Sequence, residues 1–325
     1  MKETISMPRV SVVMCTYNGE QFLTEQIESI LNQTYPIYEL IIQDDSSTDR
    51  TWEIIQEYAK KCSLIKSFRN DTNQGFNHNF KQAILRAEGE LIAIADQDDI
   101  WYPEKIEKQV QKIDGADVCI SAYHGGENYP PTNENRVTLP FYQLEYLLFY
   151  DCTPGHSMLI KKDFAHHIFR AWDGHILYDW WISVNAHLYH GITCVEEPLN
   201  WHRPHNASAI TKLNAQYAPY LVKKPTWQPY IIGFRKYRAL QKLDTWQFFY
   251  RYIHKHADPV QQHLAYQLSE LLFRRDLFSL LRLCLLCMRH KDTVYFNPNQ
   301  KGFMSYIRSF CYPMIRAYGN TYFYL

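Results

Sequence analysis

The sequence predicts an α/β fold: a mixed, mainly parallel sheet with flanking helices, followed by a helical C-terminal region. Three observations lead to this prediction. Short β-branched runs alternate with helix-periodic segments in units of about 30 residues. A polar cluster follows the end of several of these runs. From about Thr226 the pattern becomes helix after helix, without strand-like alternation.

The first two strand and helix units are the clearest. Val10–Met14 is a continuous apolar run, and apolar residues at helical spacing follow it before the break at Pro36. Tyr38–Gln43 repeats the strand pattern, and we expect Ser47 or Thr48 to cap the helix after it.

The next elements follow the same order. Leu64–Phe68 is a weaker strand, and Leu91–Ala95 is a short buried one. Between them, apolar residues at helical spacing mark a third helix: Phe80, Ile84 and Ala87. Pro103 is expected to open the fourth helix, because proline is favoured at the first helical position. After Val118–Ala122, residues 124–135 are rich in Gly, Asn and Pro and are expected to form a loop.

Length and composition set the scale of the fold. The chain has 325 residues, of which 46% are hydrophobic, so it can bury one large core and a second smaller unit. We expect an α/β domain over residues 1–215 and a helical region over 216–325. The 34 basic residues balance the 34 acidic ones, which removes any whole-chain electrostatic argument for a nucleic-acid partner.

Three polar segments should meet at one edge of the sheet. Thr16-Tyr17-Asn18, Asp44-Asp45 and Asp96–Asp99 each follow a predicted strand. In a parallel sheet, ligands bind beyond the carboxyl ends of the strands. We therefore expect these segments to line one crevice.

The turn Asp96–Asp99 places three carboxylates close together, and they would repel one another unless a cation or protons neutralised them. Mg²⁺ or Mn²⁺ binds one or two carboxylates together with phosphate oxygens, so this turn could hold a diphosphate through the ion. The alternative is a solvated turn in which Asp99 caps the next helix.

Asp45 and Tyr17 could recognise a nucleobase. A carboxylate at a strand end can accept the imide N–H of uracil or thymine, and a tyrosine ring offers a flat stacking surface. The alternatives are a helix cap within residues 44–49 and ordinary packing of Tyr17.

Asp179 begins an apolar helical segment beside Trp180 and Trp181. An apolar neighbourhood raises the pKa of a carboxylate towards that of a general base, and indoles offer platforms for sugar rings. The alternative for Asp179 is a plain helix cap. Downstream, Arg203 suits a diphosphate and His205 could complete a metal site, while the alternative is an ordinary surface loop.

The cysteines and apolar segments indicate an intracellular protein. The eight cysteines are scattered, which predicts reduced thiols, and Cys284 with Cys287 and His290 is expected to be helix packing rather than zinc binding. The N-terminus lacks a signal-like apolar stretch, and Leu277–Met288 is too short to span a bilayer. We expect a cytoplasmic protein.

The C-terminal region is basic. Residues 217–325 contain 16 Lys and Arg but 5 Asp and Glu, a net charge of +11. Several arginines alternate with Leu, Phe and Met: Arg274, Arg275, Arg282 and Arg289. Such helices predict peripheral contact with the inner face of an anionic membrane. The alternative is a soluble helical bundle or a homodimer interface.

These motifs together resemble the inverting family 2 glycosyltransferases of the GT-A fold, over about residues 7–210. The resemblance rests on their order and spacing: Ser11–Asn18, Glu39–Asp49, Asn73-Gln74-Gly75, Asp96–Trp101 with Pro103–Lys105, and Tyr178–Trp181. The segment around Arg203 and His205 is similar to a branch, rhamnosyltransferases included, that builds bacterial surface polysaccharides. The sequence departs from the family at Cys15, at Pro204 and at Tyr178, where relatives often have an acid.

The resemblance implies a role for each matching residue. Asp98 and His205 would hold Mn²⁺ or Mg²⁺, and Asp179 would be the catalytic base. As indole platforms for sugar rings, Trp180 and Trp181 would face the acceptor. The nucleotide sugar would contact Thr16, Tyr17, Asn18, Asp45, Asn73, Gly75, Asp96 and Arg203.

The implied activity is transfer of a sugar, with inversion, from a UDP- or dTDP-sugar to a saccharide or lipid-linked saccharide. Asp179 would deprotonate the acceptor, and the metal would neutralise the leaving diphosphate. A nucleotidyltransferase is one alternative, but it would need a Gly-rich phosphate loop that Cys15–Gly19 does not provide. The other is a non-catalytic carbohydrate-binding protein on the same fold.

Overall fold

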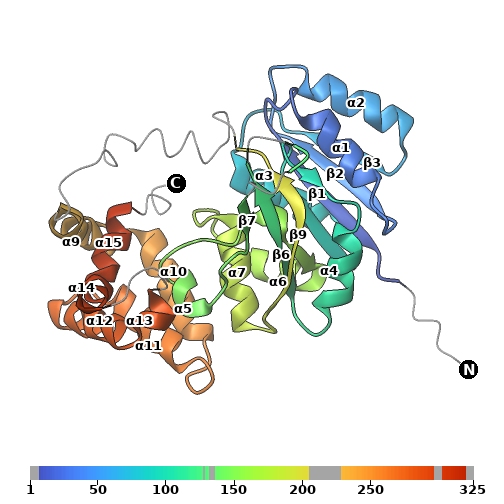
Figure 1. Ribbon diagram of the computed structural model, residues 1–325. Helices are drawn as coiled ribbons and strands as arrows, with labels where there is room; N and C mark the ends of the chain where they lie inside the picture. Colours follow the sequence, from blue (N-terminus) through green and yellow to red (C-terminus); the bar gives the residue numbers. More distant parts are fainter. Residues whose placement is uncertain (1–6, 127–128, 132–135, 205–227, 296–301, 320–325) are drawn as a thin grey trace, which may run out of the picture. The chain divides into compact units, whose positions relative to one another are not determined.

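The computed structural model describes residues 7–126, 129–131, 136–204, 228–295 and 302–319, which form two compact units (Figure 1). The sheet unit comprises residues 1–140, 153–174 and 189–209, and the helical unit comprises 141–152, 175–188 and 210–325. The expected boundary near residue 215 lies outside the described residues. Two segments of the expected α/β domain, 141–152 and 175–188, belong to the helical unit.

Four parallel strands form one half of the sheet, in the order β3-β2-β1-β4. They match the predicted strands closely: β1 (Val10–Thr16), β2 (Glu39–Asp44), β3 (Ile65–Arg69) and β4 (Leu91–Ala95). β1, β2 and β4 are buried throughout their length, which explains the apolar run at the centre of each, although β2 also buries Glu39, Gln43 and Asp44.

The other half of the sheet is mixed, as the prediction of a mainly parallel but mixed sheet requires. From β4 the order continues β8-β6-β9-β5; β4, β6 and β5 each have an antiparallel neighbour, whereas β6 and β9 are parallel. The bounds are β5 (Ile100–Trp101), β6 (Val118–Gly125), β8 (Leu159–Lys161) and β9 (Ile192–His202). β7 (Arg136–Thr138) pairs with β6, and the first two residues of the loop expected at 124–135, His124 and Gly125, belong to β6.

Helices cover both faces of the sheet (Figure 1). One face of β1 packs in a single core with three helices: α1 (Leu23–Leu31), α2 (Thr51–Lys61) and α4 (Lys105–Ile113). α3 (Phe76–Arg86) contacts β1 and β2, and α6 (Lys162–Ala171) contacts β8 and α3. This packing fixes the strand ends that carry the polar clusters.

Two predicted helix starts are wrong. α2 begins at Thr51 rather than after a cap at Ser47 or Thr48, and Asp49 Oδ1 accepts the Thr51 N–H at 3.0 Å. The Ser47 hydroxyl instead donates to Asp44, three residues earlier at the end of β2. α4 begins at Lys105, two residues after Pro103.

The helical unit contains only helices among its described residues, as expected. Two come from the inserted segments, α5 (Leu144–Leu147) and α7 (Tyr178–Leu188). The others are α9 (Gln228–Leu240), α10 (Asp244–His256), α11 (His263–Phe273), α12 (Leu277–Arg289), α13 (Lys291–Val294), α14 (Phe303–Phe310) and α15 (Tyr312–Gly319). None of the helices within the described ranges is long and apolar enough to cross a membrane.

The cysteines behave as the sequence predicts. All eight are free thiols. Cys284 and Cys287 are buried in α12, and burial raises the pKa of both thiols. Both side chains therefore pack inside the helical unit.

Candidate functional site

The predicted polar clusters meet at the carboxyl ends of β1, β2 and β4. Thr16 pairs in register with Asp44, and Met14 pairs with Ala95 just before the aspartate turn. The Asp45 N–H donates to the Thr16 carbonyl at 2.8 Å. Three segments far apart in the sequence are therefore held side by side.

Asp44 organises the end of β2. Its fully buried carboxylate accepts hydrogen bonds from the Thr16 hydroxyl (2.9 Å) and from the backbone N–H of Ser47 (3.0 Å). The Arg69 guanidinium lies 3.3 Å from its second oxygen. Thr16, predicted to contact the nucleotide, directs its hydroxyl to Asp44, so it positions the strand end.

Asp45 holds the loop before α3. Its Oδ1 accepts from Asn70 Nδ2 (2.7 Å) and from Gln74 N (2.8 Å), and its Oδ2 accepts from Gly75 N (2.9 Å). Gly75 has a φ of 81°, a conformation that favours glycine. Asn73 supports the same loop, since its Oδ1 accepts from Gly75 N at 3.1 Å. The predicted grouping of Asp45, Asn73 and Gly75 is observed.

Tyr17 and Gln97 join the first cluster to the aspartate turn. The Tyr17 N–H donates to Gln97 Oε1 at 2.9 Å, and Gln97 Nε2 donates to the Tyr17 carbonyl at 3.2 Å. The Tyr17 side chain stays 42% exposed, so a ring face is accessible. A Cβ on Gly19 would lie 2.2 Å from Gln97 Oε1, so this arrangement requires glycine at position 19. Gln97 was not among the predicted site residues.

Asn18 links the ends of β1 and β2. Its backbone lies in the left-handed region, with φ 49°. The Asn18 N–H donates to Ser47 Oγ at 2.9 Å, and its side-chain oxygen accepts from Thr48 N at 2.8 Å. Ser47 and Thr48 thus serve this link rather than a helix cap.

The aspartate turn is fixed from the end of β9. Asp98 is only 9% exposed, and its backbone carbonyl accepts from Arg203 Nε at 3.2 Å. The Arg203 guanidinium lies over the rings of Phe22 (4.5 Å) and Trp201 (4.7 Å) and pairs with the exposed Glu25. The Glu25 side chain is 57% exposed and the Arg203 side chain 21%, so water screens this ion pair from the Glu25 side and Glu25 is an exchangeable partner.

Asp99 is the buried anchor of the turn and caps no helix. Its Oδ1 accepts from His202 Nδ1 (2.9 Å) and Arg203 N (3.4 Å), and its Oδ2 from Asn200 Nδ2 (3.3 Å). Asn200 Nδ2 also donates to Nδ1 of His156, in the 3₁₀ helix Gly155–Ser157, at 3.1 Å.

The charges in this network follow from burial and proximity. Burial acts to raise the pKa of Asp99, but the neighbouring histidines outweigh it and the pKa is lowered. Burial acts to lower the pKa of His202, but the hydrogen bond and charge of Asp99 raise it to about 9. Burial dominates at His156 and lowers its pKa to about 3. At neutral pH an imidazolium and a carboxylate therefore pair beside a neutral imidazole.

Two sets of residues could hold a metal ion. Nitrogen and oxygen atoms of Asp99, His156 and His202 lie within 4.8 Å of one another, a set typical of zinc and similar metals. In the structure His202 donates to Asp99, so an ion there would displace that bond. The carboxylates of Asp96 and Asp98 are the hard donors that Mg²⁺ and Mn²⁺ prefer. His205, the other predicted ligand, lies outside the described residues.

Asp179 belongs to the first turn of α7 in the helical unit. Its Oδ1 accepts from the Trp180 N–H at 2.9 Å, and its carbonyl accepts from the Ser183 hydroxyl at 2.9 Å. The helix begins one residue earlier, at Tyr178, so Asp179 is not the capping residue before the helix.

Trp180 and Trp181 were predicted to face the acceptor, and this prediction is wrong. Both side chains are fully buried. The Trp180 indole N–H donates to the Leu147 carbonyl, and its ring packs on Phe249 at 5.1 Å. Trp181 packs on Tyr252 at 4.5 Å. The two indoles build the core of the helical unit and expose no face to a sugar.

Residues 11–173 match the sequence model of the family described as Glycosyl transferase family 2. MJ1057 of Methanocaldococcus jannaschii, described as an uncharacterized glycosyltransferase, is 31% identical over 66% of this chain and 79% of its own length. Two Bacillus subtilis proteins with glycosyltransferase assignments match a shorter region. EpsE is 45% identical over 32% of this chain and 38% of its own length. TuaG, assigned to teichuronic acid biosynthesis, is 38% identical over 32% of this chain and 41% of its own length.

Crystal structures of S. aureus TarS share the architecture. The complex of TarS residues 1–349 with UDP superposes with a TM-score of 0.54 at 17% identity, covering 90% of this chain and 98% of that one. The complex with UDP-GlcNAc gives a TM-score of 0.56 at 16% identity, covering 88% and 81%. This likeness confirms the predicted GT-A fold.

Proposed function

This chain belongs to glycosyl transferase family 2, and from that premise we propose that it transfers a sugar, with inversion, from a UDP- or dTDP-sugar to a saccharide or lipid-linked saccharide. The observation that carries this proposal is the meeting of Tyr17, Asp45 and the turn at Asp98 beyond the carboxyl ends of three adjacent strands. That edge is where open α/β sheets bind nucleotides.

The base would lie between Tyr17 and Asp45. Asp45 Oδ2 accepts one hydrogen bond, from Gly75 N, and an ionised carboxylate oxygen can accept a second. Uracil and thymine both offer an N3–H donor, and the exposed Tyr17 ring offers a stacking face. The crystal structures of TarS with UDP and with UDP-GlcNAc support a uridine donor.

The diphosphate would bind at the aspartate turn. The oxygen donors of Asp96 and Asp98 fit Mn²⁺ or Mg²⁺, and such an ion would neutralise charge on the leaving diphosphate. Arg203 lies against the Asp98 carbonyl, and its guanidinium could exchange Glu25 for a phosphate. His202, held by Asp99, adds a positive charge beside the same turn.

Asp179 would remove the proton from the acceptor hydroxyl, and that oxygen would attack the anomeric carbon from the face opposite the diphosphate. The carbon–oxygen bond to the diphosphate breaks as the new bond forms, which inverts the anomer. One carboxylate serves as base, and no second one is needed as a nucleophile.

The acceptor and location are proposed from composition and from relatives. TuaG is assigned to teichuronic acid biosynthesis, which supports a role in assembly of a bacterial capsule, cell-wall or other surface glycan. We infer that the enzyme works at the cytoplasmic face of the membrane, where the net charge of +11 over residues 217–325 would attract anionic lipids.

Calorimetry of the Asp98→Asn variant tests the nucleotide site. We expect the wild-type chain to bind UDP or dTDP more tightly than GDP and only with Mn²⁺ or Mg²⁺, and the variant to lose the metal-dependent part. Asp163→Asn, an exposed position in α6, is the matched control and should bind as the wild type does. Unchanged metal dependence in Asp98→Asn, or tighter binding of GDP, would contradict the site.

A further inference from the structure

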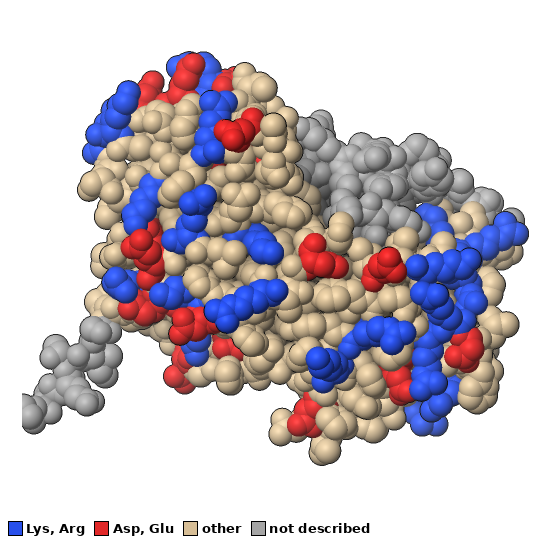
Figure 2. Space-filling view, turned by 180° about the vertical axis from the view of Figure 1, so that it is seen from behind, with Lys and Arg blue, Asp and Glu red and all other residues tan. Residues whose placement is uncertain are grey.

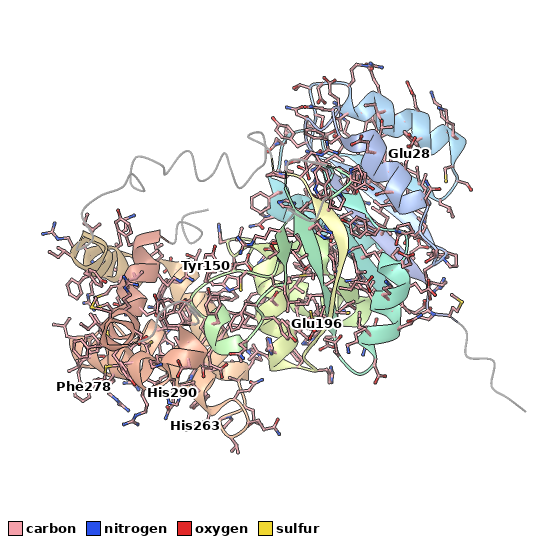
Figure 3. The ribbon with its side chains drawn as sticks, viewed as in Figure 1. Glu28, Tyr150, Glu196, His263, Phe278 and His290 are labelled. Atoms are coloured by element: carbon pink, nitrogen blue, oxygen red, sulfur yellow. The ribbon has the colours of Figure 1, made fainter. Side chains whose placement is uncertain are left out.

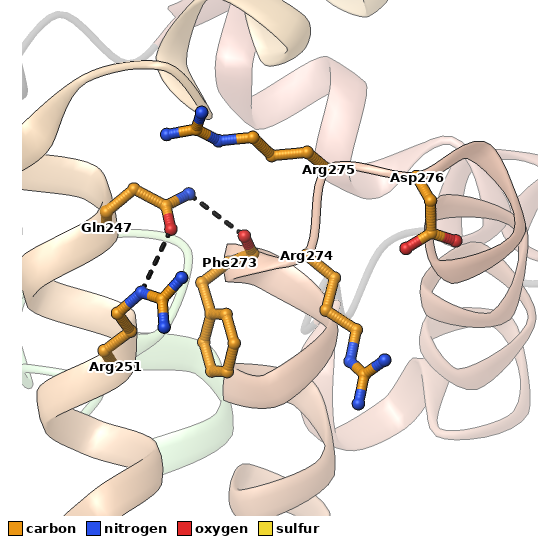
Figure 4. A pocket seen from close by; sticks show the side chains of 6 residues that line it. All are labelled: Gln247, Arg251, Phe273, Arg274, Arg275 and Asp276. Atoms are coloured by element: carbon orange, nitrogen blue, oxygen red, sulfur yellow. Dashed lines mark hydrogen bonds between the residues drawn. The ribbon is translucent and has the colours of Figure 1, made fainter.

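The helical unit carries a pocket of about 440 Å³ that the nucleotide site does not explain (Figure 4). It lies at the end of α11, where the chain turns into α12, and α10 forms its other wall. Its lining is mostly polar or charged: Gln247, Arg251, Phe273, Arg274, Arg275 and Asp276.

Two of its arginines are held in place by neutral partners. Arg251 Nε donates to Gln247 Oε1 at 3.2 Å, and its guanidinium lies 4.7 Å from the centre of the Phe273 ring. Arg275 Nε donates to the Gln241 carbonyl at 3.2 Å. Within the described ranges, neither guanidinium forms a salt bridge. Each is thus an exposed positive charge, oriented by a hydrogen bond and without a carboxylate partner, as an anion site requires.

The nearby carboxylates are committed elsewhere. Asp276 caps α12, since it accepts from both the N–H and the hydroxyl of Ser279 at 2.7 Å. Glu270 pairs with Arg274. The pocket therefore has an excess of positive charge. Lys and Arg gather on the helical unit in the view of Figure 2.

An exposed apolar surface begins directly beside the pocket. Leu277 and Phe278 follow Asp276 and are 63% and 69% exposed, and Figure 3 labels Phe278 at the outer margin of the unit. Leu281 and Leu285 continue this surface along α12. Such a row would be expected to face a core in an ordinary amphipathic helix.

α14, which packs against α12, has the opposite of the usual amphipathic arrangement. It buries Ser305 and Ser309, and the Ser309 hydroxyl donates to the Ser305 carbonyl at 2.7 Å. Its large apolar side chains are outside, with Phe303 77% and Met304 52% exposed. α12 and α14 thus expose a set of large apolar side chains of the kind that marks an interaction surface.

We propose that the pocket binds the phosphate headgroup of an anionic membrane lipid while Phe278 and Phe303 enter the boundary between headgroups and acyl chains. Fixed guanidinium groups beside exposed aromatic and aliphatic residues match the two parts of such a lipid. A second copy of the chain fits less well, because a symmetric contact through this surface would bury two basic pockets in one interface and so add like charges to it. This inference deepens the membrane contact proposed above by naming its residues.

Vesicle binding by the full chain tests the site. We would compare phosphatidylcholine vesicles with and without phosphatidylglycerol, using sedimentation at low salt. The Arg251→Gln/Arg275→Gln variant should lose binding to anionic vesicles about tenfold or more. Its control, Arg235→Gln/Lys255→Gln, removes two exposed charges of the same unit outside the pocket and should lose clearly less.

The apolar surface has its own control. Phe278→Ser/Phe303→Ser should weaken binding to anionic vesicles, whereas Val260→Ser, at a position 84% exposed between α10 and α11, should not. Equal losses in the two charge variants would overturn the pocket, and equal binding by the two apolar variants would overturn insertion. All four variants change exposed residues, and circular dichroism would verify that each variant is folded.

A soluble phosphate is the remaining source of the same chemistry. If inorganic phosphate stabilised the wild type against heat but not the arginine variant, and anionic vesicles did not bind, the lipid proposal would be overturned. Absence of vesicle binding by the wild type would overturn it as well. Calorimetry of donor binding needs no vesicles. A negative result for the lipid site would therefore leave the proposed transferase activity untouched.

Discussion

The side-chain amide of Gln97 bonds to both backbone groups of Tyr17, with distances of 2.9 Å to the N–H and 3.2 Å to the carbonyl. Gln97 lies between Asp96 and Asp98, so this pair joins the proposed base-stacking residue to the proposed metal-binding turn. A substitution that breaks this pair should therefore affect both base stacking at Tyr17 and metal binding at the aspartate turn.

Gln97→Ala should weaken donor binding by about three- to tenfold, because two hydrogen bonds worth roughly 1 kcal/mol in net terms are lost without removing any group that touches the donor. Calorimetry with UDP and Mn²⁺ would measure the change. Gln111→Ala, at an exposed site on α4, is the control. Gly19→Ala should have a similar effect, because the new Cβ would displace the Gln97 amide. Unaltered donor affinity in both variants would show that this link is merely structural.

Asp179→Asn should lower kcat by a factor of about 10² to 10⁴ while donor affinity is retained, because an amide cannot accept the acceptor proton. The variant should fold, since the Asn side-chain oxygen can still accept from the Trp180 N–H. Turnover with a competent acceptor and calorimetry with the donor separate the two effects. An equal loss of rate and donor affinity would instead assign Asp179 a structural role in α7.

The first half of the fold could be predicted because its signals are local. β1, β2 and β4 are buried along their length and each contains an apolar run, and the polar residues that follow these runs must meet at one edge. Asp45 and Tyr17 could be placed in this way. Their neighbours on the same strand ends followed from the same argument.

The rest depends on partners distant in sequence. Asp99 resembles a helix cap locally, but its charge is balanced by His202, 103 residues away. Trp180 and Trp181 resemble a sugar platform, but both are buried and pack on Phe249 and Tyr252 of α10, more than 65 residues further along the chain. The spacing of residues in the sequence predicts neither the contact of Asp99 with His202 nor the burial of the two tryptophans. Gln97 was overlooked because glutamine at that position carries no pattern of its own.

Trp180→Phe should destabilise the helical unit by about 2–4 kcal/mol and leave the KM for the acceptor unchanged. The substitution removes the indole N–H that satisfies the Leu147 carbonyl and leaves a cavity beside Phe249. Urea unfolding and acceptor titration measure the two effects. Trp52→Phe, at a half-buried position on α2, should cost less. A raised acceptor KM in a variant of normal stability would restore the sugar-platform interpretation.

Because of Glu39, the free energy of unfolding of the sheet unit should fall as the pH is lowered. Its buried carboxylate accepts from the Ser11 hydroxyl at 2.6 Å and pairs with Lys66 at 2.8 Å. Burial acts to raise the pKa of Glu39, but these partners outweigh it and the pKa is lowered. Because the unfolded chain then binds the proton more readily, this contribution is complete above the ordinary pKa of 4.5 and is lost as pH falls through the lowered value.

Glu39→Gln should accordingly lower the free energy of unfolding by about 1–3 kcal/mol at neutral pH and by progressively less as the medium becomes more acidic. Urea unfolding of both chains between about pH 7 and pH 3 would show the two stability curves converging in acid. Glu53→Gln is the matched control, since the Glu53 side chain is 68% exposed and pairs with the similarly exposed Arg50, three residues earlier. That variant should follow the wild-type curve throughout, because an exposed pair adds little to stability. If the Glu39→Gln curve ran parallel to the wild type down to the lowest pH, the carboxylate would not be the group whose protonation destabilises the sheet unit.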